Sequence, residues 1–193
     1  MMKNIVIIGA GDLGKEVVWL IEDINKVRPT YVILGFLDDD RGKNEKEFFG
    51  YKVLGTTELL DSLREKVPFC AVIAIQKGAD RKKIVDAHPG FHEWETIVHP
   101  AAVIAPESKT GDGCILFPRV TVSVDTRIGE FGLLYLNTTV CNDCSLGDYV
   151  SVMTGAVISE HVIIHSGTTL TAGTCIGPHT TIPPQAEERV QNK

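Results

Sequence analysis

The sequence predicts a small α/β domain with a parallel sheet, followed by an all-β solenoid of six-residue repeats. Three observations lead to this prediction: an apolar run that enters a glycine-rich turn, an amphipathic stretch directly after it, and an aliphatic residue at nearly every sixth position of the second half. We place the α/β domain at residues 1–97 and the solenoid at 98–182. Residues 183–193 form a polar tail, of which 185–193 read as disordered.

Composition narrows the class of protein. The chain has 193 residues, 44% of them hydrophobic, and a net charge of −6, which excludes a disordered chain and argues against binding to nucleic acid or to anionic membranes. Its five cysteines lack a disulfide spacing pattern, so reduced thiols in a cytoplasmic protein are expected. The apolar run at residues 5–8 is too short for a signal peptide or a membrane span.

The glycine-rich turn is the first candidate site. Residues 5–8 predict a strand buried on both faces, and Leu13, Val17 and Leu20 recur at helical spacing beyond the turn. Between them, residues 9–14 match G-x-G-x-x-G. Glycines between a strand and a helix let the backbone approach a phosphate, and the helix N-terminus favours the anion. We therefore expect a substrate-binding loop that contains Gly9, Gly11, Asp12 and Gly14.

A second strand is expected at residues 31–37. It ends at Asp38 and Asp39, where an acidic side chain can accept a ribose hydroxyl. Further strands at 69–75 and 94–98, with helices near 56–64 and 80–87, give three or four parallel strands, about half of a full dinucleotide fold. This Rossmann-like unit favours a nucleotide or nucleotide sugar over NAD, and a structural turn without a ligand is the remaining alternative.

The second half has a period of six. Of the fifteen positions counted in sixes from Val98 to Ile182, fourteen are Ile, Leu or Val, and the exception is Thr110. The residue four places after each of these anchors is small or Val. Each step therefore supplies a short strand with an inward aliphatic side chain, followed by a small residue where the chain turns. One coil cannot bury its own apolar side, so the coils must stack.

This pattern resembles the left-handed β-helix of the hexapeptide acyltransferases, in which three steps make a coil of eighteen residues. The two halves together resemble the bacterial PglD/NeuD-type sugar acyltransferases. The segments that carry the resemblance are 8–11 with Gly14, 35–39, 71–75 with Arg81, 98–100 and 146–148.

The resemblance implies an acetyl-CoA-dependent transferase that acts on an amine or hydroxyl of a nucleotide-linked sugar. It implies a UDP-sugar in the first domain, with Asp38 and Asp39 near the base. It also implies a homotrimer with active sites between neighbouring subunits.

The chain departs from the family pattern at the catalytic position. The family has a catalytic histidine followed by an acidic residue, where this chain has Asn142 and Asp143. An amide is not a base at neutral pH. The glycine loop differs too, with Asp12-Leu13 in place of Gly-His. The segment after the last coil, which helps enclose coenzyme A in the family, is short here.

A substitute base is available in the repeat register. Residues eighteen apart should stack, which places Asp143 and His161 about 5 Å apart. A carboxylate can orient a neighbouring imidazole and raise its basicity, so we predict a substitute dyad; two solvated corner residues are the more common situation and the competing interpretation. Gly155 matches the family glycine whose N–H faces the acetyl carbonyl, and Gly155 and Gly173 are the predicted cofactor-binding positions.

Three hypotheses for function follow. The first is acetyl transfer from acetyl-CoA to a nucleotide-linked sugar. The second is a binding or regulatory relative that has lost this chemistry, as Asn142 and the short carboxyl end suggest. The third and weakest is a metal-dependent β-helix hydratase whose metal ligands would be His161, His165 and His179. Solvent-exposed histidines that bind no metal are the favoured interpretation of these residues. No metal is expected.

Overall fold

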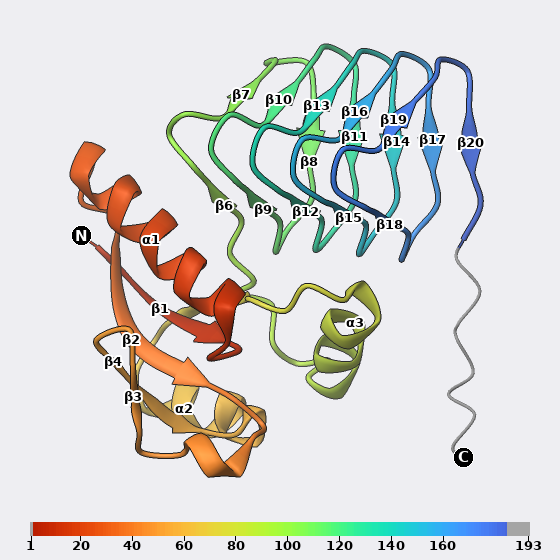
Figure 1. Ribbon diagram of the computed structural model, residues 1–193. Helices are drawn as coiled ribbons and strands as arrows, with labels where there is room; N and C mark the ends of the chain where they lie inside the picture. Colours follow the sequence, from red (N-terminus) through yellow and green to blue (C-terminus); the bar gives the residue numbers. More distant parts are fainter. Residues whose placement is uncertain (1, 185–193) are drawn as a thin grey trace, which may run out of the picture.

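The computed structural model describes residues 2–184 and has two domains in sequence (Figure 1). The predicted disordered segment at 185–193 lies outside the described residues. The first domain has a sheet in the order β3-β4-β2-β1-β5, in which β1, β2, β4 and β5 are parallel and β3 is antiparallel to β4. Its elements are β1 (Lys3–Ile8), α1 (Asp12–Val27), β2 (Tyr31–Leu37), η1 (Arg41–Lys43), β3 (Glu47–Phe48), β4 (Tyr51–Gly55), η2 (Thr57–Leu59), α2 (Leu60–Lys66), β5 (Cys70–Ile73) and α3 (Gly78–Ala87).

Two details of this sheet differ from the sequence prediction. The β3–β4 hairpin was not expected, and its β4 strand pairs with the end of β2 through Phe36 and Val53. The expected strand at 94–98 is not a full strand of this sheet: Trp94 forms a single bridge with Ala71. The indole of Trp94 packs edge-on against Phe91 and Phe131, so the chain turns toward the second domain there.

The second domain is a left-handed β-helix of two-residue strands. All fifteen strands end on the sixfold anchors, and they form three parallel sheets of five strands each. Partners lie eighteen residues apart: Leu134 pairs with Val152, and Val152 pairs with Leu170, all three buried. This interior file confirms the predicted fold. The strands are β6 (Ile97–Val98), β7 (Val103–Ile104), β8 (Lys109–Thr110), β9 (Ile115–Leu116), β10 (Thr121–Val122), β11 (Arg127–Ile128), β12 (Leu133–Leu134), β13 (Thr139–Val140), β14 (Ser145–Leu146), β15 (Ser151–Val152), β16 (Val157–Ile158), β17 (Ile163–Ile164), β18 (Thr169–Leu170), β19 (Cys175–Ile176) and β20 (Thr181–Ile182).

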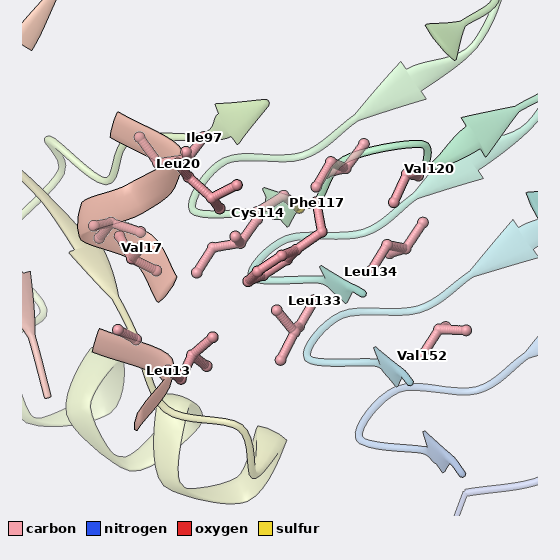
Figure 2. Packing of buried hydrophobic residues seen from close by; sticks show 14 of the residues in the cluster. Leu13, Val17, Leu20, Ile97, Cys114, Phe117, Val120, Leu133, Leu134 and Val152 are labelled. Atoms are coloured by element: carbon pink, nitrogen blue, oxygen red, sulfur yellow. The ribbon is translucent and has the colours of Figure 1, made fainter. Parts of the chain in front are cut away.

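The first domain covers one face of the β-helix. Leu13, Val17 and Leu20 of α1 point toward the sheet that begins with β6, β9 and β12 (Figure 2). The outward side chains of that sheet, such as Ile115 and Leu133, are therefore buried. Equivalent outward positions on the other two faces, including Val103, Val157 and Ile163, stay exposed. Hydrophobic burial thus fixes the two domains against each other.

The corners of the β-helix require an unusual backbone. From residue 113 onward, the β-helix turns at its corners through residues with φ between +54° and +75°, a region that costs little for glycine and is tolerated by Asn and Asp. The corner columns are read by stepping eighteen residues. One contains Asp125, Asp143, His161 and His179; a second contains Arg119, Asn137, Gly155 and Gly173; a third contains Gly113, Phe131, Tyr149 and Gly167. Within residues 2–184, no helix combines the length and apolar character that a membrane crossing requires.

Candidate active site and nucleotide pocket

An open pocket of about 420 Å³ lies where the parallel strands of the first domain end. Ligands of open α/β sheets bind at this carboxyl edge. The glycine loop, the end of β2 and the segment after β5 all contribute to it. Its lining residues are Ile8, Gly9, Gly11, Asp12, Leu13, Leu37, Asp38, Asp39, Lys43, Thr57, Ala74, Ile75, Gln76 and Ile84.

The three glycines of the loop have different roles. Gly9 has φ +105°, and a Cβ there would lie 2.7 Å from the carbonyl oxygen of Ala74. Gly11 has open space around it and lines the pocket. Gly14 is buried against the loop, where a Cβ would lie 2.2 Å from the carbonyl oxygen of Gly9. Gly14 therefore lets α1 approach β1 and does not itself line the pocket.

Asp38 holds the glycine loop in place. Its Oδ2 accepts hydrogen bonds from the backbone N–H of Ala10 and from Lys43 Nζ, both at 2.8 Å, and its Oδ1 accepts the N–H of Asp40 at 2.9 Å. Partial burial works to raise the pKa of Asp38, but these hydrogen bonds outweigh it and lower the pKa overall. Asp38 is thus an ionised clamp on the loop.

Asp39 and Asp12 lie at the rim of the same pocket. Asp39 Oδ1 accepts both the N–H and the hydroxyl of Thr57 at 2.8 Å, which ties the end of β2 to η2. Asp12 is the first residue of α1 and lines the pocket beside Gly11. The structure therefore brings together five of the six predicted substrate-binding residues, and Gly14 supports them from behind.

Two pocket residues lacked a specific signal in the sequence. Lys43 lies five residues beyond Asp38, in η1, and nothing in its neighbourhood marks it as a pocket cation. Gln76 could have been found, because it follows the buried strand predicted at 69–75, and side chains after parallel strands meet at the carboxyl edge. Its Nε2 lies 3.4 Å from Met153 Sδ, so the pocket wall contacts the β-helix.

The predicted dyad residues are neighbours on one corner of the β-helix. His161 Nδ1 lies 4.0 Å from Asp143 Oδ2, which is closer than the expected strand spacing but too long for a hydrogen bond. The side chains of His161 and Asp143 are 47% and 44% exposed. Asn142 Nδ2 donates to the same Asp143 oxygen at 2.7 Å, and the ring of His161 stacks on His179 at 4.7 Å. Asn142 thus competes with His161 for the Asp143 carboxylate.

The predicted cofactor positions lie on another corner. Gly155 and Gly173 both have φ +70°, and no atom lies within 4 Å of a Cβ built at either. The Gly155 N–H donates to the carbonyl oxygen of Leu136 at 2.9 Å, and the Gly173 N–H donates to Thr154 at 2.9 Å. Each corner therefore offers an open backbone surface, while the N–H groups themselves are engaged within the β-helix.

The histidines do not gather into a metal site. Across residues 2–184, no group of three or more His, Cys, Asp or Glu side chains is placed to hold a metal ion. The hydratase hypothesis therefore finds no set of ligands in the described part of the chain.

The comparisons with known proteins match both domains. The profile of the PglD N-terminal domain family matches residues 4–87. The acetyltransferase domain of PglB from Neisseria gonorrhoeae, in complex with acetyl coenzyme A, is 25% identical with a TM-score of 0.70, covering 94% of this chain and 96% of that one. The first domain therefore matches the PglD N-terminal domain family, and the whole chain resembles solved acetyltransferase structures.

Two further solved structures resemble this chain. WeeI from Acinetobacter baumannii is 25% identical over 92% of this chain and 95% of that one, with a TM-score of 0.66. A histidine-to-asparagine mutant of perosamine N-acetyltransferase from Caulobacter crescentus, in complex with CoA and GDP-perosamine, is 22% identical over 94% of this chain and 91% of that one, with a TM-score of 0.74. No curated protein matches the chain.

Proposed function

We propose that this protein is an acetyltransferase that moves the acetyl group of acetyl-CoA to the amine of a nucleotide-linked sugar. The observation that carries the proposal is the open glycine-loop pocket, whose wall at Gln76 contacts Met153 of the β-helix. A nucleotide held in the pocket would thus have its sugar end near the domain that performs transfer in related folds. The similar structures with bound CoA, acetyl coenzyme A and GDP-perosamine support this assignment.

The pocket suggests how the nucleotide is held. Backbone N–H groups at the start of α1 and the Lys43 ammonium are the positive groups available to a diphosphate. Asp38 already accepts three hydrogen bonds, so its part is to shape the loop. We assign Asp12 and Asp39 as acceptors for hydroxyl or N–H donors of the nucleoside, whether it is a uridine or a guanosine.

The corner at His161 suggests the chemistry. The sugar amine attacks the thioester carbonyl carbon, a C–N bond forms, and the amine proton passes to His161. The tetrahedral oxyanion then collapses, the C–S bond breaks, and the CoA thiolate leaves and takes a proton. Asp143, 4.0 Å from His161, is the carboxylate of the proposed dyad.

A homotrimer would complete the site. Within one chain, Asp143 and His161 lie on one corner column and Gly155 and Gly173 lie on another. A site that uses both columns therefore needs neighbouring subunits, and exposed apolar side chains such as Val157 and Ile163 are available for such a contact. Light scattering coupled to size exclusion measures this directly, and a monomeric mass contradicts it.

One observation favours a second function, a nucleotide-sugar-binding relative without transfer activity. Asn142 stands where the family has its base, and its amide nitrogen donates to Asp143 at 2.7 Å. An acid–base role is closed to an amide. In that case nucleotide sugars would stabilise the protein against heat without any release of CoA.

The test is thiol release from acetyl-CoA in the presence of GDP- and UDP-linked amino sugars. We expect release that depends on the acceptor, a loss of about a hundredfold in His161→Ala, and a change below about threefold in Asn142→Ala. His165→Ala, which changes an exposed histidine directly after β17, is the matched control. Equal activity in wild type and His161→Ala overturns the dyad. Binding of a nucleotide sugar without release overturns the transferase assignment.

A further inference from the structure

An arginine is buried between the two domains with neutral partners. Arg81, on α3, is only 2% exposed, and burial lowers the pKa of its guanidinium to about 10. It remains a cation at neutral pH, so its burial must be offset by hydrogen bonds. Its acceptors are all neutral: the carbonyl oxygens of Phe131 (3.0 Å), Ile75 (2.9 Å), Gln76 (2.7 Å), Tyr149 (3.0 Å) and Val150 (3.3 Å), and Ser151 Oγ (3.0 Å).

These acceptors come from two places. Ile75 and Gln76 follow β5 and line the nucleotide pocket, whereas the other four belong to the β-helix. A second hydrogen bond joins the same groups, because Ser151 Oγ donates to the carbonyl oxygen of Gln76 at 2.8 Å. The pocket wall at residues 75–76 is therefore fastened to the β-helix through its own backbone.

The start of α3 packs tightly against the β-helix beside this contact. A Cβ at Gly78 would lie 2.2 Å from the carbonyl oxygen of Tyr149, so helix and β-helix corner are in direct backbone contact. Gln76 also contacts Met153, two residues before Gly155. The wall thus lies between the nucleotide pocket and the β-helix segment that leads to Gly155.

We propose that Arg81 is a positioning residue for the acceptor: it fixes the Ile75–Gln76 wall so that a nucleotide-linked sugar is directed toward the β-helix. This inference rests on the proposed function. Arg81 itself touches no substrate, because it is buried behind the wall. A purely structural arginine would affect the amount of folded protein but would not discriminate between the two substrates.

Steady-state kinetics of Arg81→Lys test the proposal, with Arg127→Lys, an exposed arginine on β11, as the matched control. Lysine keeps the charge but cannot reach carbonyls on both sides at once. We expect the KM for the nucleotide sugar to rise about tenfold or more while the KM for acetyl-CoA changes by less than about twofold. An unchanged acceptor KM, or an equal rise for both substrates, overturns the proposal.

Ser151→Ala provides a milder variant in case Arg81→Lys folds poorly, with the half-buried Ser123→Ala as its control. We expect hydrogen–deuterium exchange to accelerate at residues 74–78 in Ser151→Ala and not in Ser123→Ala, with a smaller but selective rise in acceptor KM. Unchanged exchange at residues 74–78 would contradict the claim that these hydrogen bonds hold residues 75–76 against the β-helix. The exchange experiment needs no substrate, so failure of wild type to transfer acetyl would refute the proposed function without deciding the role of Arg81.

Discussion

Gly11 and Gly14 belong to one loop, yet the structure predicts opposite effects of the same substitution. A Cβ at Gly14 would lie 2.2 Å from the carbonyl oxygen of Gly9, about 1 Å inside van der Waals contact. Both groups are backbone-anchored, so α1 must shift away from β1. A Cβ at Gly11 meets nothing within 4 Å, and its φ of −112° suits alanine.

The magnitude for Gly14→Ala follows from two opposing effects. Overpacking of a tight contact costs up to about 3 kcal/mol. Alanine is the better helix former inside α1 by about 1 kcal/mol, which leaves a net loss of about 2 kcal/mol. For a chain of this size, that loss lowers Tm by about 4 to 8 °C. Gly11→Ala, at the N-cap, costs less, about 0.5 to 1 kcal/mol, because alanine is a poorer N-cap residue than glycine.

Thermal unfolding followed by circular dichroism measures the stability of both variants, and calorimetric titration with GDP and UDP measures their nucleotide binding. We expect Gly14→Ala to lose more stability than Gly11→Ala, and we expect Gly11→Ala to bind nucleotide more weakly because its methyl group enters the pocket. A Tm of Gly14→Ala equal to that of wild type would refute the assignment of Gly14 to helix packing. Unimpaired binding by Gly11→Ala would refute the nucleotide site.

Three further substitutions test the Asp38 hydrogen bonds, the contact between the two domains and the β-helix core. The pKa of Asp38 is lowered in the folded state, so its ionised form stabilises the fold at neutral pH and this contribution is lost on acidification. The difference in urea unfolding free energy between wild type and Asp38→Asn should therefore shrink as the pH falls from about 6 to about 3, and a difference that does not change with pH contradicts this. Tyr135→Phe removes the hydroxyl that donates to Glu16 of α1 and should lower the free energy of unfolding by about 1 to 2 kcal/mol; a value near zero would mean that the domain interface does not depend on this hydrogen bond. Val152→Ala opens a cavity between Leu134 and Leu170 and should cost about 2 to 3 kcal/mol, whereas the exposed Val27→Ala at the end of α1 should stay within about 0.5 kcal/mol; equal losses would contradict the interior file.

The β-helix was predictable because its cause is local and repeated. Each six-residue step faces the same problem of burying one aliphatic side chain, so the anchors from Val98 to Ile182 mark the end of every strand. The same period predicted that Asp143 and His161 would be neighbours. It did not predict that Asn142 would donate to Asp143, since that contact depends on side-chain rotamers rather than on the repeat.

The first domain was less fully predictable for a different reason. The short β3 and β4 strands are held by pairing with β2 rather than by their own pattern, and the 94–98 segment is drawn away by packing of Trp94. Arg81 carried part of the family resemblance, but its role depends on carbonyls at residues 131 and 149–150, which only the assembled domains bring together. Contacts between distant segments are set by tertiary packing and leave no local signal.

The most direct test of acetyl transfer to a nucleotide-linked sugar is to follow a labelled acetyl group. The wild-type protein is incubated with ¹³C-acetyl-CoA and GDP-perosamine or a UDP-linked amino sugar, and the nucleotide sugar is recovered for mass spectrometry and NMR. We expect label in an amide on the sugar ring, formed in step with free CoA and lost in His161→Ala. A nucleotide sugar that protects the protein from unfolding yet returns without label would contradict it.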